Sequence, residues 1–284
     1  MRYLILLLAI MFNIFSNTVM AESLRISPDE LNKLIGSDIH IIDVRPKNDY
    51  DIVHIKGAIN FPVNLTYSNK KVNGEIIQPA QMQKYLRALG IKTNSNIIVY
   101  DGGKLVDAAR VFWAFEVYGL QHVKILDHGL NYWLNKDFPT EQKTPDITPS
   151  QYVVRINHKR LSSKFTTQLA IHNDKKLVID ARSSPAYKGE TSVAKRFGHI
   201  PSAINVPYDD NINQNTGFSK LKSIAELKKL YADVPHNKKI IIYCKIGRVS
   251  STNYFALREL GHDVSNYDAS WREWGNDDSL PIEK

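Results

Sequence analysis

One cysteine, Cys244, stands at a point of the chain where a nucleophile would be activated. It follows the apolar run Lys239–Tyr243, which predicts a buried strand, and five loop residues separate it from a helical stretch that begins at about Ser250. Where a buried strand leads into a helix, backbone N–H groups converge on an anion and the helix dipole adds positive potential. A thiolate is stabilised by this arrangement, so we expect the sulfur of Cys244 to act as a nucleophile.

The side chains of this loop suit an anionic ligand. Lys245 and Arg248 are cations, and Gly247 can adopt the positive φ that a tight loop needs. The hydroxyl of Ser250 is suited to cap the helix or to donate a hydrogen bond to a sulfur anion. The predicted active-site loop after the cysteine comprises Lys245, Ile246, Gly247, Arg248, Val249 and Ser250.

The first 21 residues have the pattern of a secretory signal peptide. Arg2 precedes an apolar run from Leu4 to Phe15, and small residues, Val19 and Ala21, occupy the positions expected before a cleavage site. The apolar run is about a dozen residues, short of the roughly 20 that span a bilayer, so a retained membrane anchor is disfavoured. We therefore expect export to the periplasm, without membrane association after cleavage.

Export makes the single cysteine informative. One cysteine excludes an intramolecular disulfide and leaves a free thiol in an oxidising compartment. A buried, inert cysteine that acts as a small hydrophobe is the alternative to a reactive one. The neighbours of Cys244 favour the reactive interpretation.

Composition limits the class of protein and of ligand. The chain has 284 residues, of which 43% are apolar and 23% charged, as in globular proteins of one large or two mid-sized domains. Its net charge of +8 would attract nucleic acid, a membrane surface or a small anion. Because the lysines are scattered and no basic block is interleaved with aromatic residues, we expect no nucleic-acid partner and a small anionic substrate.

The elements that position Cys244 occur twice, about 140 residues apart, which indicates a duplicated domain. Four segments recur in the same order: Ile42–Arg45 and Ile179–Arg182, His54–Asn60 and His199–Asn205, Ile97–Asp101 and Ile240–Cys244, Asp127–Trp133 and Asp268–Trp274. The segment 139–151, rich in proline and threonine, is a predicted linker. We therefore predict a signal peptide at 1–21 and domains at 22–138 and 152–284.

Each domain is predicted to be α/β, because short apolar runs alternate with helical patterns. Strands that are buried on both faces and separated by helices indicate a parallel sheet flanked by helices on both sides. His54 and His199 recur in both halves, and so do Asp43 and Asp180, so we interpret all four as structural. Asp101 stands where the first domain would carry a cysteine, and a carboxylate cannot accept a sulfur atom. The first domain is thus predicted to be catalytically silent.

The second half carries Asp180-x-Arg182, the run Gly198–Pro207, Cys244-x-x-Gly247 and Trp271-x-x-Trp274. With these motifs in register, essentially the whole mature chain resembles the tandem-domain rhodaneses, which include thiosulfate and 3-mercaptopyruvate sulfurtransferases. The resemblance implies that the Cys244 thiolate takes the outer sulfur of a small anionic donor as a persulfide. A thiol or cyanide acceptor then removes it, in ping-pong chemistry.

The resemblance also implies which cations bind the donor: Arg182 and Arg196, beside Lys245 and Arg248. A salt bridge with Asp180 is the alternative role for Arg182, and the adjacent Lys195 is the alternative to Arg196. Relatives that use thiosulfate typically have basic residues after the cysteine, whereas those that use mercaptopyruvate have small neutral ones. Lys245 and Arg248 therefore favour thiosulfate.

Two other functions are alternatives to a sulfurtransferase. Phosphatases of this fold have a Cys-x5-Arg loop, but the arginine position is Ser250 here, so a phosphatase is disfavoured. A non-enzymatic persulfide carrier for a partner protein stays open, because it shares the first half of the reaction. The histidines show no ligand spacing, so no metal or other cofactor is expected. We expect a monomer, because two fused homologous domains already supply the interface of a homodimer.

Overall fold

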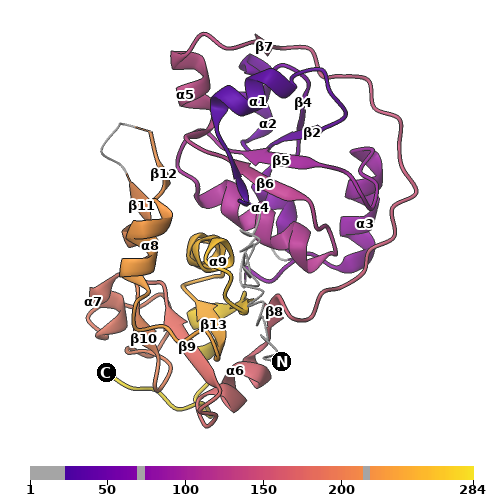
Figure 1. Cartoon of the computed structure of the whole chain (residues 1–284). Helices are drawn as coiled ribbons and strands as arrows, with labels where there is room; N and C mark the ends of the chain where they lie inside the picture. Colours follow the sequence, from indigo (N-terminus) through magenta and orange to yellow (C-terminus); the bar gives the residue numbers. More distant parts are fainter. Residues whose placement is uncertain (1–22, 69–73, 214–217) are drawn as a thin grey trace, which may run out of the picture.

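The computed structural model describes residues 23–68, 74–213 and 218–284, so the predicted signal peptide lies outside the described residues. Within them the chain forms two α/β domains, each built on a five-stranded sheet (Figure 1). Every neighbouring pair of strands in these two sheets is parallel. The predicted fold class is confirmed.

The first sheet has the order β1-β6-β5-β2-β4. Its strands are β1 (Arg25–Ile26), β2 (His40–Asp43), β4 (Ala58–Asn60), β5 (Ile97–Tyr100) and β6 (Val123–Leu126). The helices around it are α1 (Pro28–Leu34), α2 (Lys47–Ile52), η1 (Val63–Thr66), α3 (Pro79–Ala88), α4 (Val106–Val117) and α5 (Gly129–Asn135). Helices α3 and α4 bury apolar side chains on one face of the sheet, and α1, α2 and α5 do so on the other.

The second sheet has the order β10-β9-β13-β14-β8. This matches the order of the first sheet when that sheet is followed from β4 to β1. Its strands are β8 (Leu161–Ser162), β9 (Lys176–Asp180), β10 (Ile204–Asn205), β13 (Lys239–Tyr243) and β14 (Val264–Tyr267). The helices around it are α6 (Lys164–Ala170), α7 (Ser184–Tyr187), η2 (Tyr208–Asn211), α8 (Ile224–Leu230), α9 (Ser250–Glu259) and α10 (Ser270–Trp274). Two short antiparallel pairs complete the fold: β3 (His54–Ile55) with β7 (Thr140–Glu141), and β11 (Ile212–Asn213) with β12 (Lys220–Leu221).

The duplicated polar residues have the same structural role in both domains. His54 Nδ1 lies 2.8 Å from the carbonyl of Tyr50 and its ring stacks on that tyrosine. In the second domain, His199 Nδ1 lies 2.9 Å from the carbonyl of Tyr187 and stacks on it in turn. The structural interpretation of the two histidines agrees with this geometry.

The segment that joins the domains runs along the first one. The hydroxyl of Tyr152 donates to the carbonyl of Tyr118, and Asn157 N–H donates to the carbonyl of Val117. The second sheet begins only at Leu161. By these contacts, therefore, the segment 152–157 lies along the first domain.

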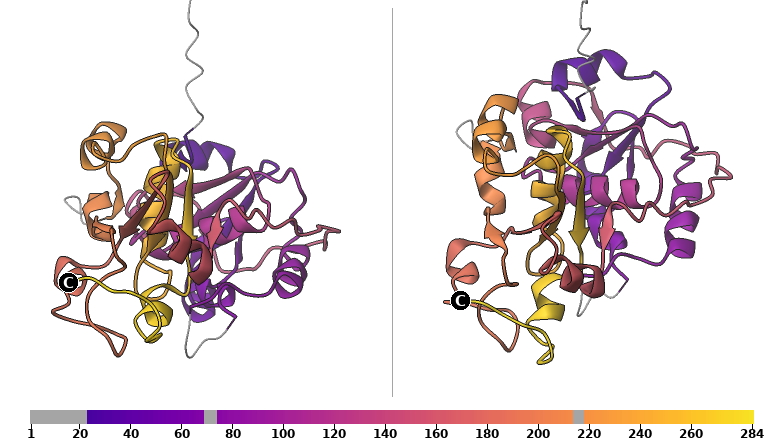
Figure 2. Two further views of the ribbon diagram at one scale, coloured as in Figure 1. Left: turned by 90° about the horizontal axis from the view of Figure 1, so that it is seen from below. Right: turned by 60° about the horizontal axis from the view of Figure 1, so that its bottom comes forward.

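One apolar core crosses the boundary between the domains, because α4 packs against α9. The ring of Phe112 on α4 meets that of Phe255 on α9 edge to face, with centroids 5.0 Å apart. A single cluster of buried side chains runs from the first sheet through these two helices to the second sheet. In Figure 1, α9 lies where the domains meet, and the further views in Figure 2 show the domains side by side along this boundary.

A buried acid on α4 holds the two helices in register. Glu116 accepts hydrogen bonds from the hydroxyl of Tyr254, at 2.5 Å, and from Arg258 Nε and NH2, at 3.1 and 2.7 Å. Its side chain is 9% exposed and that of Arg258 is 20% exposed. The ion pair is therefore largely screened from water and sensitive to the loss of one partner.

Among the described residues, the helices are all too short or too polar to cross a lipid bilayer.

Glu116→Gln should lower the free energy of unfolding by about 2–3 kcal/mol, because it leaves the Arg258 guanidinium buried without a counter-charge. Urea denaturation measures the loss. Asp51→Asn is the control: it breaks the exposed pair with Lys47, whose side chains are 59% and 50% exposed, and should change stability by less than about 0.5 kcal/mol. Equal effects of the two substitutions would contradict this account of α4 and α9.

A second prediction concerns Asp268, whose carboxylate accepts the N–H of Ile76 from the other domain at 2.5 Å. Burial raises the pKa of Asp268 from 3.8 to about 6. Ionisation is thus less favourable in the folded state, so its contribution to the free energy of unfolding falls as pH rises from about 4 to 6. Asp268→Asn has no such titration. Its stability relative to the parent protein should improve by roughly 1–3 kcal/mol between about pH 4 and pH 7, measured by urea denaturation. A difference that stays constant with pH would refute it.

Candidate active site

Cys244 follows β13 directly and its side chain is fully buried. Two hydrogen bonds hold its backbone against the start of α10. Its N–H donates to the Ser270 hydroxyl at 3.1 Å, and its carbonyl accepts from Trp271 N–H at 3.0 Å. The nucleophile predicted from the sequence therefore lies at the carboxyl end of a central strand, on a fixed backbone.

Gly247 is required by the shape of the loop that follows. Its φ is +72°, and a Cβ built there would lie 2.5 Å from the carbonyl oxygen of Asp268. The Gly247 carbonyl accepts three hydrogen bonds: from Arg110 NH1 at 3.0 Å, Asn266 Nδ2 at 3.0 Å and the Ser251 hydroxyl at 3.1 Å. Because Arg110 belongs to the first domain and Asn266 and Ser251 belong to the second, both domains hold the loop through the Gly247 carbonyl.

The hydroxyls at the start of α9 are not helix caps, contrary to expectation. The N-cap residue is Val249, and the helix has no side-chain cap. Ser250 donates its hydroxyl hydrogen bond to Asn266 Oδ1 at 2.8 Å, because both side chains are buried beneath the loop. The N–H groups of Ser251 and Thr252 donate to the backbone carbonyls of Arg248 and Val249, at 3.1 and 3.0 Å.

In the first domain, the loop at the corresponding position binds a carboxylate through its backbone N–H groups. Asp101 Oδ1 accepts from the N–H groups of Gly103, Lys104 and Leu105 at 2.8, 3.0 and 3.2 Å, and Oδ2 accepts from Ala108 at 3.4 Å. Burial raises the pKa of Asp101, while these hydrogen bonds oppose the rise. A carboxylate thus occupies the cradle at the same place in the duplicated fold as the cysteine.

Arg182 is held in a structural ion pair, the alternative that the sequence left open. Its Nε lies 3.0 Å from both carboxylate oxygens of Asp180, its NH2 donates to the Gly198 carbonyl at 2.7 Å, and it lies over the Trp271 ring. Arg45 and Asp43 make the same ion pair in the silent domain. The arrangement is therefore a property of the fold, although Arg182 also lines a small pocket.

That pocket, of about 80 Å³, is the place where Arg182 and Lys245 come together. It is lined by Arg182, Ala186, Thr191, Ser192, Val193 and Lys245. Lys245 directly follows Cys244, and its side chain is exposed. Of the four cations proposed for the donor, these two share a pocket at the start of the active-site loop.

Arg196, predicted to bind the donor, directs its guanidinium to backbone carbonyls at and beyond the end of α10. Its NH1 donates to the Leu280 carbonyl at 2.7 Å, and its NH2 donates to the carbonyls of Trp274, at 2.9 Å, and Asp277. These carbonyls lie at and beyond the end of α10, where the helix dipole favours a cation. Arg196 therefore fixes the carboxyl-terminal segment. Lys195, its alternative, uses its backbone N–H to bind Asn276.

Arg248 also has a partner that the sequence did not indicate. Its Nε and NH2 donate to Asp107 Oδ1 at 2.7 and 2.6 Å, across the domain boundary. Arg248, predicted to bind the donor, is therefore paired with an acid of the first domain. The reason is the contact of α4 with α9, which places residues far apart in sequence side by side.

The first domain contributes more to the site than a scaffold. A Cβ on Gly74 would lie 2.2 Å from the Ile246 carbonyl, so that segment lies directly on the loop. Arg110 donates to the carbonyls of Gly247 and Gly74 and lies over the ring of Tyr67. The contact is reciprocal, because Ser219 N–H in the second domain donates to the carbonyl of Gly103 in the silent loop.

The buried hydroxyl of Tyr67 has no hydrogen-bond partner among the described residues. Arg110 and Tyr67 were both missed in the sequence. Arg110 carried a signal: it is a single cation within an apolar helical run, Ala108 to Phe115, and a buried arginine needs several acceptors.

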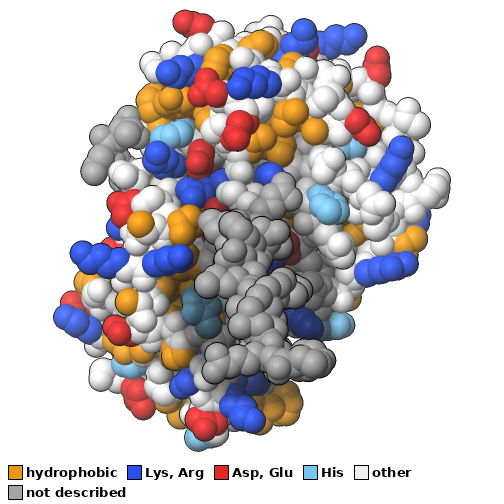
Figure 3. Space-filling view, viewed as in Figure 1, with side chains coloured by type: hydrophobic (Ala, Val, Ile, Leu, Met, Phe, Trp, Pro, Cys, Tyr) orange, Lys and Arg blue, Asp and Glu red, His pale blue; other side chains and the backbone are white. Residues whose placement is uncertain are grey.

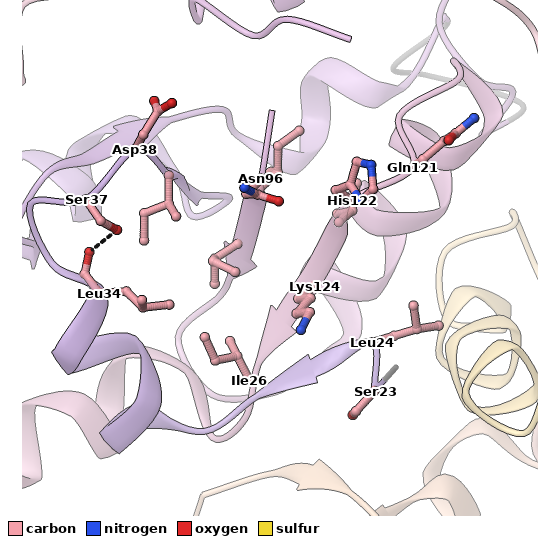
Figure 4. A pocket seen from close by; sticks show the side chains of 14 residues that line it. Ser23, Leu24, Ile26, Leu34, Ser37, Asp38, Asn96, Gln121, His122 and Lys124 are labelled. Atoms are coloured by element: carbon pink, nitrogen blue, oxygen red, sulfur yellow. Dashed lines mark hydrogen bonds between the residues drawn. The ribbon is translucent and has the colours of Figure 1, made fainter. Parts of the chain in front are cut away.

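The other surfaces do not suggest a second reaction centre. The pocket in Figure 4 lies where β5 and β6 begin, around Asn96 and Lys124, at the edge of the sheet opposite to Asp101. On the face shown in Figure 3, basic and acidic side chains are interspersed, without a continuous basic stripe. In the described part of the chain there is no group of three or more potential metal ligands of the types His, Cys, Asp and Glu.

Comparison with known proteins agrees with this architecture. The family model described as Rhodanese-like domain matches twice, over residues 27–136 and 166–277. A protein of Mycobacterium bovis, provisionally named thiosulfate sulfurtransferase 1, is 36% identical over 246 residues, which cover 82% of this chain and 87% of its own. A protein of Haloferax volcanii, provisionally named thiosulfate sulfurtransferase, is 32% identical over 247 residues, covering 83% and 85%.

Among solved structures, the 3-mercaptopyruvate sulfurtransferase SseA from Escherichia coli superposes with a TM-score of 0.78 and 27% identity. The match covers 88% of this chain and 99% of SseA. The duplicated fold is thus that of a known family. The chain therefore belongs to the rhodanese family of sulfurtransferases and carries two Rhodanese-like domains in tandem.

Proposed function

We propose that this chain transfers a sulfur atom from thiosulfate to a thiol or to cyanide through a persulfide on Cys244. The observation that carries the proposal is the position of Cys244 at the end of β13, in a loop whose copy in the first domain holds a carboxylate with four backbone N–H groups. By analogy with that loop, backbone N–H groups after Cys244 would stabilise the negative charge of a thiolate or of a persulfide sulfur.

The reaction has two steps that share one nucleophile. In the first, the thiolate of Cys244 attacks the outer sulfur of thiosulfate, the sulfur–sulfur bond of the donor breaks, and sulfite leaves with the electron pair. In the second, the acceptor attacks the terminal sulfur of the persulfide, and the electrons of that bond return to Cys244 as a thiolate. Cyanide becomes thiocyanate and a thiolate becomes a persulfide, so no oxidant or reductant is consumed.

The charges around the loop suit an anionic donor. Lys245 follows the nucleophile directly and shares a pocket with Arg182, whose charge is partly balanced by Asp180. The start of α9, without a side-chain cap, adds positive potential from the helix dipole. The proposal of thiosulfate as donor rests on Lys245 and this helix, since Arg248 is already paired.

Export is a separate proposal, because the segment that supports it lies outside the described residues. The apolar run after Arg2 and the small residues before Glu22 suit cleavage after Ala21 and delivery to the periplasm. Cell fractionation, with sequencing of the amino terminus of the purified protein, tests it. A full-length chain that remains in the cytoplasm would refute it.

Cys244→Ser should abolish sulfur transfer, because a serine hydroxyl cannot hold the transferred atom as a persulfide. The assay follows sulfite release from thiosulfate in the presence of cyanide, and mass spectrometry of the protein after thiosulfate alone should show one added sulfur on Cys244. Turnover that survives in the serine variant would overturn the proposal. A single stoichiometric uptake of sulfur without turnover would favour a carrier for a partner protein instead.

The donor can be identified by comparing kcat/KM for thiosulfate and for 3-mercaptopyruvate. We expect thiosulfate to be the better donor, because it carries two negative charges near Lys245, whereas the 3-mercaptopyruvate carboxylate carries one. Lys245→Met should lower kcat/KM for thiosulfate by about tenfold, equivalent to about 1.4 kcal/mol. A strong preference for 3-mercaptopyruvate in the parent protein would show that the donor assignment is wrong.

A further inference from the structure

The ion pair between Asp107 and Arg248 joins the silent domain to the active-site loop. Asp107 is the second residue of α4, and Arg248 lies in the loop that connects Cys244 to α9. Both guanidinium donors converge on one oxygen, Asp107 Oδ1, at 2.7 and 2.6 Å. A cation of the second domain is therefore neutralised by an acid of the first.

This pairing changes the number of charges that a donor meets. In sequence the loop carries two cations, Lys245 and Arg248, which would suit a dianion. In the structure the charge of Arg248 is balanced by Asp107, so that the loop side chains present a single net positive charge. The acid that determines this balance lies outside both the loop and the catalytic domain.

The pair is placed so that it can be altered without disrupting a core. The side chain of Arg248 is 45% exposed and that of Asp107 is 28% exposed. Partly exposed pairs contribute only about 0–1 kcal/mol to stability, because water screens both charges. Removing the acid should leave the fold intact and free the guanidinium for another anion, which it can bind through two parallel N–H groups.

We propose that Asp107 sets the charge selectivity of the active site: the silent domain restrains Arg248 and thereby limits the preference for dianionic over monoanionic sulfur donors. The inference rests on the proposed function, because it concerns the donors of that reaction. It gives Asp107 a role in specificity that does not require contact with the donor. Substitution of this one residue should change which anion binds, not how the sulfur is transferred.

The test measures binding separately from turnover. In the Cys244→Ser background, which cannot take up sulfur, calorimetry gives the Kd of thiosulfate and of 3-mercaptopyruvate with and without Asp107→Asn. We expect Asp107→Asn to lower the Kd of thiosulfate about three- to tenfold and that of 3-mercaptopyruvate about two- to threefold, because a freed charge attracts a dianion more strongly. The ratio of the two constants is the readout, and a purely structural effect would not change it.

Three further variants in the same background identify the cause. Asp107→Glu keeps the carboxylate and should retain the parent ratio. Asp107→Asn with Arg248→Gln should lose the gain, because the freed cation is gone. Glu259→Gln is a distant control: it breaks another cross-domain pair, with Arg25 at 3.1 Å, on a more buried side chain at the far end of α9 from the loop. It should leave the ratio unchanged.

The inference is overturned if Asp107→Asn leaves the ratio as it was, or if the gain persists without Arg248. Thermal unfolding of each variant shows that it is folded, and the Asp107→Glu variant supplies the comparison if the asparagine variant is not. Failure of the proposed function would give a different result. The protein with Cys244 intact would then transfer no sulfur from any donor, whatever the binding constants in the serine background.

Discussion

The packing of α4 against α9 determines where the charged groups of the active site lie. Phe112 and Phe255 form part of a core that both domains share, and Glu116 holds Tyr254 and Arg258 in register beside them. Because α4 is fixed in this way, the side chains at its start reach the active-site loop. The apolar contact therefore positions polar groups that neither domain could place alone.

Duplication followed by divergence explains the division of labour. Both domains retain the same strand order, the same arginine–aspartate pair and a loop after the central strand. In the first domain, Asp101 fills its own cradle of N–H groups, so a ligand would have to displace a buried carboxylate. In the second domain, Cys244 occupies the position that corresponds to Asp101. The first copy supplies Arg110 and Asp107 to the loop of the other half.

The parts of the fold that depend on local pattern could be predicted from the sequence, whereas the partners of charged side chains could not. The repeated motifs indicated two parallel sheets, and Cys244 and Gly247 were identified from a strand, a loop and a helix that adjoin in sequence. The sequence indicated an ion pair as the alternative role of Arg182, because Asp180 is two residues away. The acceptors of Arg196 and Arg248, near Leu280 and at Asp107, could not be predicted because they are set by tertiary packing.

The shared core has a consequence for the order in which the chain is made. Ribosomes deliver the amino-terminal half first, so the apolar face of α4, with Phe112 and Trp113, forms before α9 exists. That face lacks its partner until the second half is made, and Cys244 precedes α9 by only five loop residues. In chain order, therefore, the surface of α4 that packs on α9 precedes Cys244, and the second half is made with its partner surface already present.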